Sequence, residues 1–470
     1  MQELSSSFDQ NIDTLDGILC PKDNFDIIKR EMEINSQRVV MYYVDGFVTA
    51  ALMQKLMMHL TSVKSFGKGQ AGDVERFVKT SVPSVEVDAV YDVDTLVTMV
   101  LSGCSAILAE GFGAGAVIVD ARSYPARVTE EPGNDKVMRG ARDGFVETLI
   151  FNTAMVRRRI RDSRLRVKYA NVGECSKTDV AIVYIEGKAD PVYVKQLVDK
   201  INSIKTDALP MGHQSLIECL IRKRWYNPFP KVRCTERPDA ACASILEGSV
   251  IVLCDTSPEA MILPTAIFDF LQETDDYYYP SFTGTYLRLI RQMVFLGAIF
   301  LTPVWYTLVV NAPYLPDWIA FIVPKDMGQV PIIAQLLIVE LVLDGLKLAS
   351  LNTPSVLSNS FSVVGGLLLG DFAVQIGWLC PDAIFYMAIE AIAGFTQSNY
   401  ELGYAFKYMR ILTIILVHFF NYWGLIIGTL VTIVLIATNQ TVLGKRDYLY
   451  PLIPFNWKAL KSLLFRVKKP

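Results

Sequence analysis

Histidine is scarce in this chain, and cysteine never comes in closely spaced pairs. The 470 residues include three histidines and eight scattered cysteines, and no Cys-x-x-Cys motif occurs. Structural zinc sites draw ligands from such pairs, and disulfide frameworks need regular cysteine patterns. We therefore expect no metal site and no disulfide, with the thiols reduced and packed as small apolar side chains.

Motifs of catalysis and nucleotide binding are also missing. The chain has no P-loop, no Ser/His/Asp grouping and no paired-carboxylate motif. The glycine-rich stretch GFGAGA (111–116) does not open a helix after a strand, so it indicates a turn better than a nucleotide site. We expect neither enzyme activity nor a cofactor.

A large net charge is absent, as is a secretory signal. The formal net charge is −3, so no basic field favours nucleic acid as a partner. The first residues, Met-Gln-Glu-Leu-Ser-Ser-Ser, lack the basic and apolar regions of a signal peptide. The soluble part of the chain is therefore expected to stay in the cytoplasm.

Long apolar runs are plentiful, but only after residue 285. Residues 286–470 contain five of them: Met293–Val310, Ile332–Leu351, Phe361–Leu379, Ala383–Phe395 and Ile411–Ala437. A helix needs about 20 apolar residues to cross the hydrocarbon core. Runs one, three and five meet this length, run two carries three ionisable residues, and run four is short. The pattern predicts an α/β cytoplasmic head and an all-α polytopic membrane domain with about four spans.

Basic residues flank the apolar runs on both sides. Arg288 and Arg291 precede the first run, and the last run is followed by Lys445, Arg446, Lys458, Lys461, Arg466, Lys468 and Lys469. Positively charged flanks remain in the cytoplasm. Both termini are therefore expected to be cytoplasmic, which requires an even number of crossings. Run four is the natural re-entrant segment, if protein or a water-filled cavity covers its backbone.

One order of elements occurs twice in the head. VVMYYVDG (39–46) precedes the helical stretch 47–60, and DVAIVYIEG (179–187) precedes the helical stretch 190–204. In both copies, a later helix is followed by two more strands. We predict two related α/β subdomains, although chance recurrence of a common βα pattern is the alternative. The expected parts are an N-terminal tail (1–35), subdomain 1 (36–125), a linker with a basic helical segment (126–178), subdomain 2 (179–285) and the membrane domain (286–470).

The segment between the two copies is strongly basic. A predicted helix from Asp143 leads into a cluster formed by Arg157, Arg158, Arg159, Arg161, Arg164, Arg166 and Lys168. We interpret the cluster as a solvated face whose charges pair with acidic neighbours. Anionic lipid headgroups and subunit contacts are the alternatives.

Four long motifs stand in order along nearly the whole chain. They are EEPGNDKVMRGARDGFVETLIFNTAMVRRRI (130–160), CTERPDAACASILEG (234–248), FSVVGGLLLGDFAVQIG (361–377) and FTQSNYELGYAFKYMR (395–410). These motifs resemble those of the spore germination receptor A-subunit family. The resemblance implies a multi-pass protein of the inner spore membrane that takes part in ion or small-solute release during germination. It also implies an oligomeric, pore-forming assembly with other germination membrane proteins.

One stretch departs from that family's usual pattern. Residues 352–359 read NTPSVLSN, where receptor A-subunits usually have Pro-Val-Gly-Gln. The difference favours a branch of the family without direct nutrient-receptor duty.

Three ionisable residues interrupt run two. Glu340, Asp344 and Lys347 lie three or four positions apart and therefore share one helical face. Ionisable groups at membrane depth cost about 3 kcal/mol each and usually face a cavity or one another. We expect these residues to line a pore or ion pathway. Mutual neutralisation of Asp344 and Lys347 is the alternative.

Run three combines small and polar residues. Its glycines are Gly365, Gly366, Gly370 and Gly377, and its polar residues include Ser362, Asp371 and Gln375. Glycines let helices approach closely, and Gly366 with Gly370 forms a GxxxG pair. We expect a pore lining or a tight subunit interface here, with plain helix packing as the alternative.

These observations lead to one predicted function with two alternatives. We predict a membrane subunit of a spore-germination ion channel or release complex, which forms homo-oligomers in the lipid bilayer. The first alternative is a non-conducting scaffold or signalling subunit of a germination complex. The second is a secondary transporter, although no repeated pair of broken helices is visible.

Overall fold

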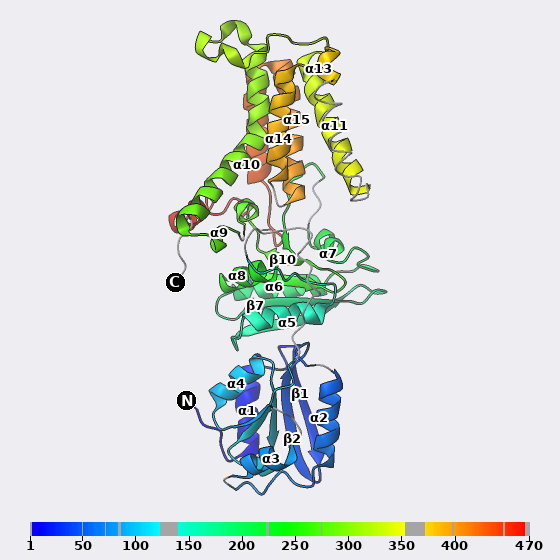
Figure 1. The fold of residues 1–470 in the computed structure, drawn as a ribbon, viewed down its shortest axis with the longest axis vertical. Helices are drawn as coiled ribbons and strands as arrows, with labels where there is room; N and C mark the ends of the chain where they lie inside the picture. The colour runs from blue at the N-terminus through cyan, green and yellow to red at the C-terminus, as the bar shows by residue number, and fades with distance from the viewer. Residues whose placement is uncertain are drawn as a thin grey trace. The chain divides into compact units, whose positions relative to one another are not determined.

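The chain forms two compact units in a computed structural model (Figure 1). The head unit comprises Met1–Lys223 and Val232–Thr265, and the helical unit comprises Arg224–Lys231 and Ala266–Pro470. The structure describes residues 2–48, 50–70, 72–82, 86–122, 140–221, 225–273, 275–352, 372–396, 399–444 and 447–465.

The first half of the head unit is built on a five-stranded antiparallel sheet. Its strand order is β1-β2-β4-β5-β3, formed by β1 (Ile27–Ile34), β2 (Gln37–Val44), β4 (Ser105–Ala109), β5 (Ala116–Val119) and β3 (Val87–Val90). Side chains alternate between the two faces along each strand. Val40 and Tyr42 therefore pack against one group of helices, whereas Val39 and Met41 pack against another.

Helices cover both faces of this sheet. α1 (Phe8–Leu19) and α4 (Val93–Leu101) lie on one face, and α2 (Ala50–Ser62) and α3 (Asp73–Ser81) lie on the other (Figure 1). Leu15 on α1 and Leu96 on α4 are fully buried on the first face. Leu60 on α2 and Phe77 on α3 are buried on the second face. The result is a three-layer α/β/α arrangement.

The second half of the head unit has a sheet with the equivalent strand order. This order is β6-β7-β9-β10-β8, formed by β6 (Leu165–Val172), β7 (Thr178–Ile185), β9 (Val250–Cys254), β10 (Ala260–Leu263) and β8 (Arg233–Thr235). α5 (Leu149–Arg159) and α8 (Pro238–Leu246) cover one face. Two further helices, α6 (Pro191–Asn202) and α7 (His213–Leu220), lie between β7 and β8 in the chain.

The two halves share the same order of elements: helix, two strands, two helices, strand, helix, two strands. The α/β head predicted from the sequence is confirmed by these two antiparallel sheets. The predicted start of α6 is also correct, because the Asp190 side chain caps the helix by accepting a hydrogen bond from Val192 N at 2.9 Å.

Residues 1–35 are not a tail. They contribute α1 and β1, and β1 pairs with β2 along its whole length. Asn35 and Ser36 have positive φ angles of 49° and 61°, as a tight two-residue hairpin turn requires. The charged sequence IIKREMEI hides the strand because β1 is an edge strand, six of whose eight residues are exposed or partly exposed. In the same way, the expected linker segment 126–178 contains α5 and β6.

The basic cluster is not uniformly solvated. Arg159 pairs with Asp143 at 2.6 Å, and Arg166 pairs with Glu186 at 2.7 Å, as the sequence predicts for a solvated face. Arg157 differs, because it is 0% exposed and forms a bidentate ion pair with Asp26, with both N···O distances 2.9 Å. The prediction of a solvated face is therefore wrong for Arg157, which connects α5 to the segment before β1.

The helical unit is all-α in the described residues. Its main helices are α10 (Ser281–Val310), α11 (Ile332–Asn352), α14 (Pro381–Phe395), α15 (Tyr400–Phe420) and α16 (Tyr422–Ala437), with the short α9 (Asp275–Tyr278), α13 (Ala373–Gln375) and α17 (Trp457–Leu464). Two of them, α10 and α15, are long and apolar enough to cross a membrane. Large apolar side chains also remain exposed on the other helices of the unit, including Leu341 on α11 at 73% and Phe385 on α14 at 61%.

Run five is two helices and not one span. The helix is interrupted at Asn421, whose φ of 52° lies outside the right-handed helical region. α15 and α16, on either side of this residue, run antiparallel. Gly424 packs on Leu416 so closely that an added Cβ would clash with the Leu416 carbonyl oxygen. Gly428 packs on Thr413 in the same way. The prediction of one span over run five is therefore wrong, because the high hydropathy of the run conceals the turn at Asn421.

Candidate functional site: a buried charge network in the helical unit

Acidic and basic side chains meet in the interior of the helical unit. Arg410 on α15 donates to Glu340 on α11 and to Glu390 on α14, with both N···O distances 2.7 Å. Lys407, one turn before Arg410, pairs with Asp344 and lies 3.4 Å from Glu340 Oε1. The ion pairs thus connect three helices that lie next to one another in Figure 1.

Further hydrogen bonds fix this network in place. The Thr302 hydroxyl on α10 donates to Glu390 Oε1 at 3.0 Å, and Arg410 Nη1 also donates to the Ala298 carbonyl oxygen at 2.9 Å. α10 is therefore the fourth helix of the site. Arg410 Nε is buried without a hydrogen-bond partner among the described residues.

The network is strongly buried and carries a formal charge imbalance. Glu340, Glu390, Lys407 and Arg410 are each exposed by 9% or less. We call the five residues Glu340, Asp344, Glu390, Lys407 and Arg410 the charge network. Three carboxylates face two cationic groups, so the formal charge is −1 when all five are ionised. An unbalanced charge in a low-dielectric interior is costly, so it favours an additional cation, a bound proton or water.

The structure brings two of the predicted residues of run two into this site. Glu340 and Asp344 are members of the charge network, and their cationic partners come from α15. Lys347 lies 6.0 Å from the Tyr404 ring centroid, at the far end of the same helix. Asp344 is therefore paired across helices with Lys407.

The predicted residues of run three are placed only in part. Ser362, Gly365, Gly366, Gly370 and Asp371 lie outside the described residues. Gln375 is exposed on α13, near the start of α11, where Gln329 N bonds to Gly377 O at 2.8 Å. Glu340 is eight residues into α11, or about 12 Å along the helix axis from that end. Gln375 and the charge network are therefore separated along the direction of the α11 axis.

Gly377 does not serve helix packing. Its φ of +76° places it in a turn after α13, and the nearest atom to an added Cβ would be Gln329 Nε2 at 3.9 Å. This glycine is required by its backbone conformation and not by a close helix contact. The close contacts among the described helices are instead at Gly424 and Gly428.

Sequence reasoning missed three members of the charge network. Glu390 lies inside apolar run four, and Lys407 and Arg410 lie three positions apart just before run five. An ionisable residue within an apolar helix is the same signal that identified Glu340. Pairing these charges across helices could not be read from the sequence, because each partner is 20 to 70 positions away.

The chain combines an α/β head unit with long apolar helices whose interior holds paired charges, and this combination is typical of a membrane protein. The family described as "Bacillus/Clostridium GerA spore germination protein" matches residues 18–470. The chain belongs to this family, and it is a germination-related membrane protein.

Individual relatives agree with this assignment. Stage V sporulation protein AF of Bacillus subtilis (strain 168) is 40% identical over 447 residues, which cover 95% of this chain and 90% of that protein. Spore germination protein KA of the same strain is 28% identical, with 94% of this chain and 81% of that protein covered. The sequence motifs had predicted the family, and this prediction is confirmed.

One solved structure is also similar. The crystal structure of the N-terminal domain of the A subunit of the Bacillus megaterium spore germinant receptor GerK3 is 22% identical, with a TM-score of 0.41. The similarity covers 56% of this chain and 96% of that chain.

Proposed function

We propose that this protein is a membrane subunit of a spore-germination ion-release complex, in which copies of the chain surround a pore. The proposal also includes a multi-pass membrane domain, association with other germination membrane proteins, and the inner spore membrane as the location. It is supported by family membership and by the similarity to Stage V sporulation protein AF and Spore germination protein KA.

The observation that carries the proposal is the excess of carboxylates in the charge network. Ionisable groups are expensive in a membrane interior unless they are paired or hydrated, and they mark ion pathways. Two cations neutralise two of the three carboxylates, which leaves one negative charge to attract a cation. We propose that this cluster faces a hydrated path. Ser362, Gly366, Gly370 and Asp371 remain candidates for its continuation, and Gln375 is a candidate for its mouth.

Neutral replacement of Glu340 and Asp344 tests the proposal. The double variant Glu340→Gln/Asp344→Asn retains Glu390, Lys407 and Arg410, so the formal charge of the network changes from −1 to +1. We expect the preference for K⁺ over Cl⁻ to fall or reverse in proteoliposomes containing the purified chain. Ion flux is measured under a potassium chloride gradient, and assembly is measured by gel filtration in detergent.

A matched control removes the same charge elsewhere. Asp317 and Asp326 are exposed in the segment between α10 and α11, so Asp317→Asn/Asp326→Asn should leave the ion preference unchanged. An assembled Glu340→Gln/Asp344→Asn protein with unaltered flux and preference would remove both residues from the pathway. Complete absence of flux from the wild-type chain would favour the non-conducting scaffold.

Native thiols test the cytoplasmic location that we propose for the head unit. Cys175 and Cys219 are exposed, whereas burial raises the pKa of the Cys242 and Cys254 thiols to about 12. A membrane-impermeant maleimide should therefore label Cys175 and Cys219 in inside-out membrane vesicles and not in right-side-out ones. Cys242 and Cys254 should stay unlabelled in both, because a raised pKa keeps a thiol protonated at pH 8. Mass spectrometry identifies the labelled sites, and labelling of Cys175 in right-side-out vesicles would contradict the orientation.

A further inference from the structure

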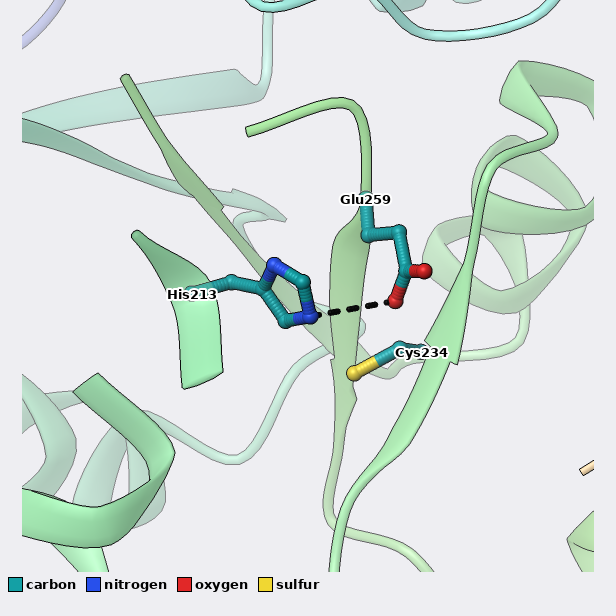
Figure 2. Close-up of side chains that lie close together, drawn as sticks. All are labelled: His213, Cys234 and Glu259. Carbon is teal, nitrogen blue, oxygen red and sulfur yellow. Dashed lines mark ion pairs between the residues drawn. The ribbon is translucent and has the colours of Figure 1, made fainter. Parts of the chain in front are cut away.

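Three potential metal ligands converge at one edge of the second sheet. His213 begins α7, Cys234 lies in β8, and Glu259 immediately precedes β10 (Figure 2). β8 and β10 pair antiparallel, with Cys234 opposite Met261. Because side chains alternate along a strand, Glu259 shares the face of Met261 and hence that of Cys234. This is the face opposite Ala260 and Ile262, which pack against α5 and α8.

The ligand atoms are close enough to share one ion. His213 Nε2 lies 3.2 Å from Glu259 Oε2, and one ligand atom from each of the three residues lies within 4.8 Å of the others. Zinc binds nitrogen and oxygen at about 2.0–2.2 Å and thiolate sulfur at about 2.3 Å, so tetrahedral ligands stand roughly 3.3–3.6 Å apart. The thiolate would have to move by no more than roughly 1.5 Å to reach this distance.

A second layer of contacts orients the histidine. His213 Nδ1 hydrogen-bonds with the Ser257 hydroxyl, which leaves Nε2 directed at Glu259. Gly212 allows this approach, because its φ is +51° and an added Cβ would lie 3.2 Å from Ser257 Cβ. Histidines that bind metals usually have their other ring nitrogen fixed in this way.

We propose that His213, Cys234 and Glu259 bind a divalent transition-metal ion of the zinc type. An imidazole, a thiolate and a carboxylate are a ligand set that favours Zn²⁺ over Mg²⁺ or Ca²⁺, which prefer oxygen ligands alone. All three side chains are partly exposed, so an ion can enter and water can take the fourth position. The ion would connect α7 to the β8–β10 edge. The spacing rules that excluded a metal site did not detect it, because the ligands come from three separate elements.

Metal binding is measured on the full-length chain in detergent, purified without a polyhistidine tag. After loading with Zn²⁺ and gel filtration, elemental analysis should give about one zinc per chain. Loading with Co²⁺ in place of zinc should produce a thiolate-to-cobalt charge-transfer band in the near ultraviolet. Losing a single second-layer partner typically costs 10–100-fold in metal affinity, so loss of the ligand in Cys234→Ser should cost at least about 100-fold.

Two further variants separate this site from adventitious binding. Cys219→Ser removes an exposed thiol from the same helix α7 and should keep both the zinc and the cobalt band. Ser257→Ala removes only the partner of the His213 ring and should weaken zinc binding by about 10–100-fold. Far-ultraviolet circular dichroism establishes that each variant is folded. The proposal is overturned if folded Cys234→Ser keeps wild-type zinc affinity, or if the wild-type chain shows no thiolate band with Co²⁺.

Discussion

Replacing Arg410 with methionine is expected to destabilise the helical unit more than any other single change in the charge network. Arg410 is the only member that bonds to two carboxylates at 2.7 Å, and without it Glu340 and Glu390 lose their shortest ion pairs. Removing one partner of a buried ion pair typically costs about 3–5 kcal/mol. For a unit of this size, we expect the unfolding temperature to fall on the order of 10 °C. Thermal unfolding of the detergent-solubilised chain measures this fall.

Two comparisons make the Arg410 result specific. Lys458→Met removes a positive charge from the exposed surface of α17 and should leave the unfolding temperature unchanged. The triple variant Arg410→Met/Glu340→Gln/Glu390→Gln should recover much of the loss, because no unpaired charge then remains in the interior. An unfolding temperature that does not change in Arg410→Met would mean that water solvates the two carboxylates and that the pairs carry little stability.

Replacing Arg157 with methionine is expected to have a comparable effect on the head unit. The guanidinium is 0% exposed and Asp26 is 1% exposed, so the variant leaves a carboxylate buried without its bidentate partner. We expect a loss of about 3–5 kcal/mol in the free energy of unfolding. Because the pair connects the two halves of the head, limited proteolysis should also cleave between them faster.

Arg164 supplies the control for this experiment. Its side chain is 58% exposed and pairs with Asp162, so Arg164→Met should leave the free energy of unfolding close to that of the wild-type chain. Arg157→Met combined with Asp26→Leu should be more stable than Arg157→Met alone, since no charge is then buried. Equal proteolysis of the Arg157→Met and wild-type chains would contradict a connecting role for this pair.

Much of the head could be read from the sequence because its signals are local. Short apolar runs rich in β-branched residues, VVMYYVDG and DVAIVYIEG, predict strands that the structure places inside each sheet, next to an edge strand, as β2 and β7. Asp190 followed by Pro191 predicts a helix start, because an N-cap side chain and a proline at the first helical position both act within the first turn. The edge strands β1 and β6 were missed, because a strand with one exposed side carries charges that mask its periodicity.

Other features could not be predicted, because they depend on residues distant in the sequence. The basic cluster contains several arginines of similar local context, and only the position of Asp26 makes Arg157 a buried partner. Run five has a high mean hydropathy despite His418 and Asn421, so hydropathy alone cannot reveal the turn at Asn421. The ligand cluster of His213, Cys234 and Glu259 combines residues from α7, β8 and the start of β10.

The sequence by itself determined the division into an α/β head and apolar helices, the repeated order of elements, and the family. These properties rest on composition, periodicity and contiguous motifs, which are set by neighbours along the chain. The tertiary structure alone decided which charges are neutralised by which partners and which glycines meet another helix. Ion pairing and close packing depend on distances through space, and folding brings Glu340 within 2.7 Å of Arg410 across 70 positions of sequence.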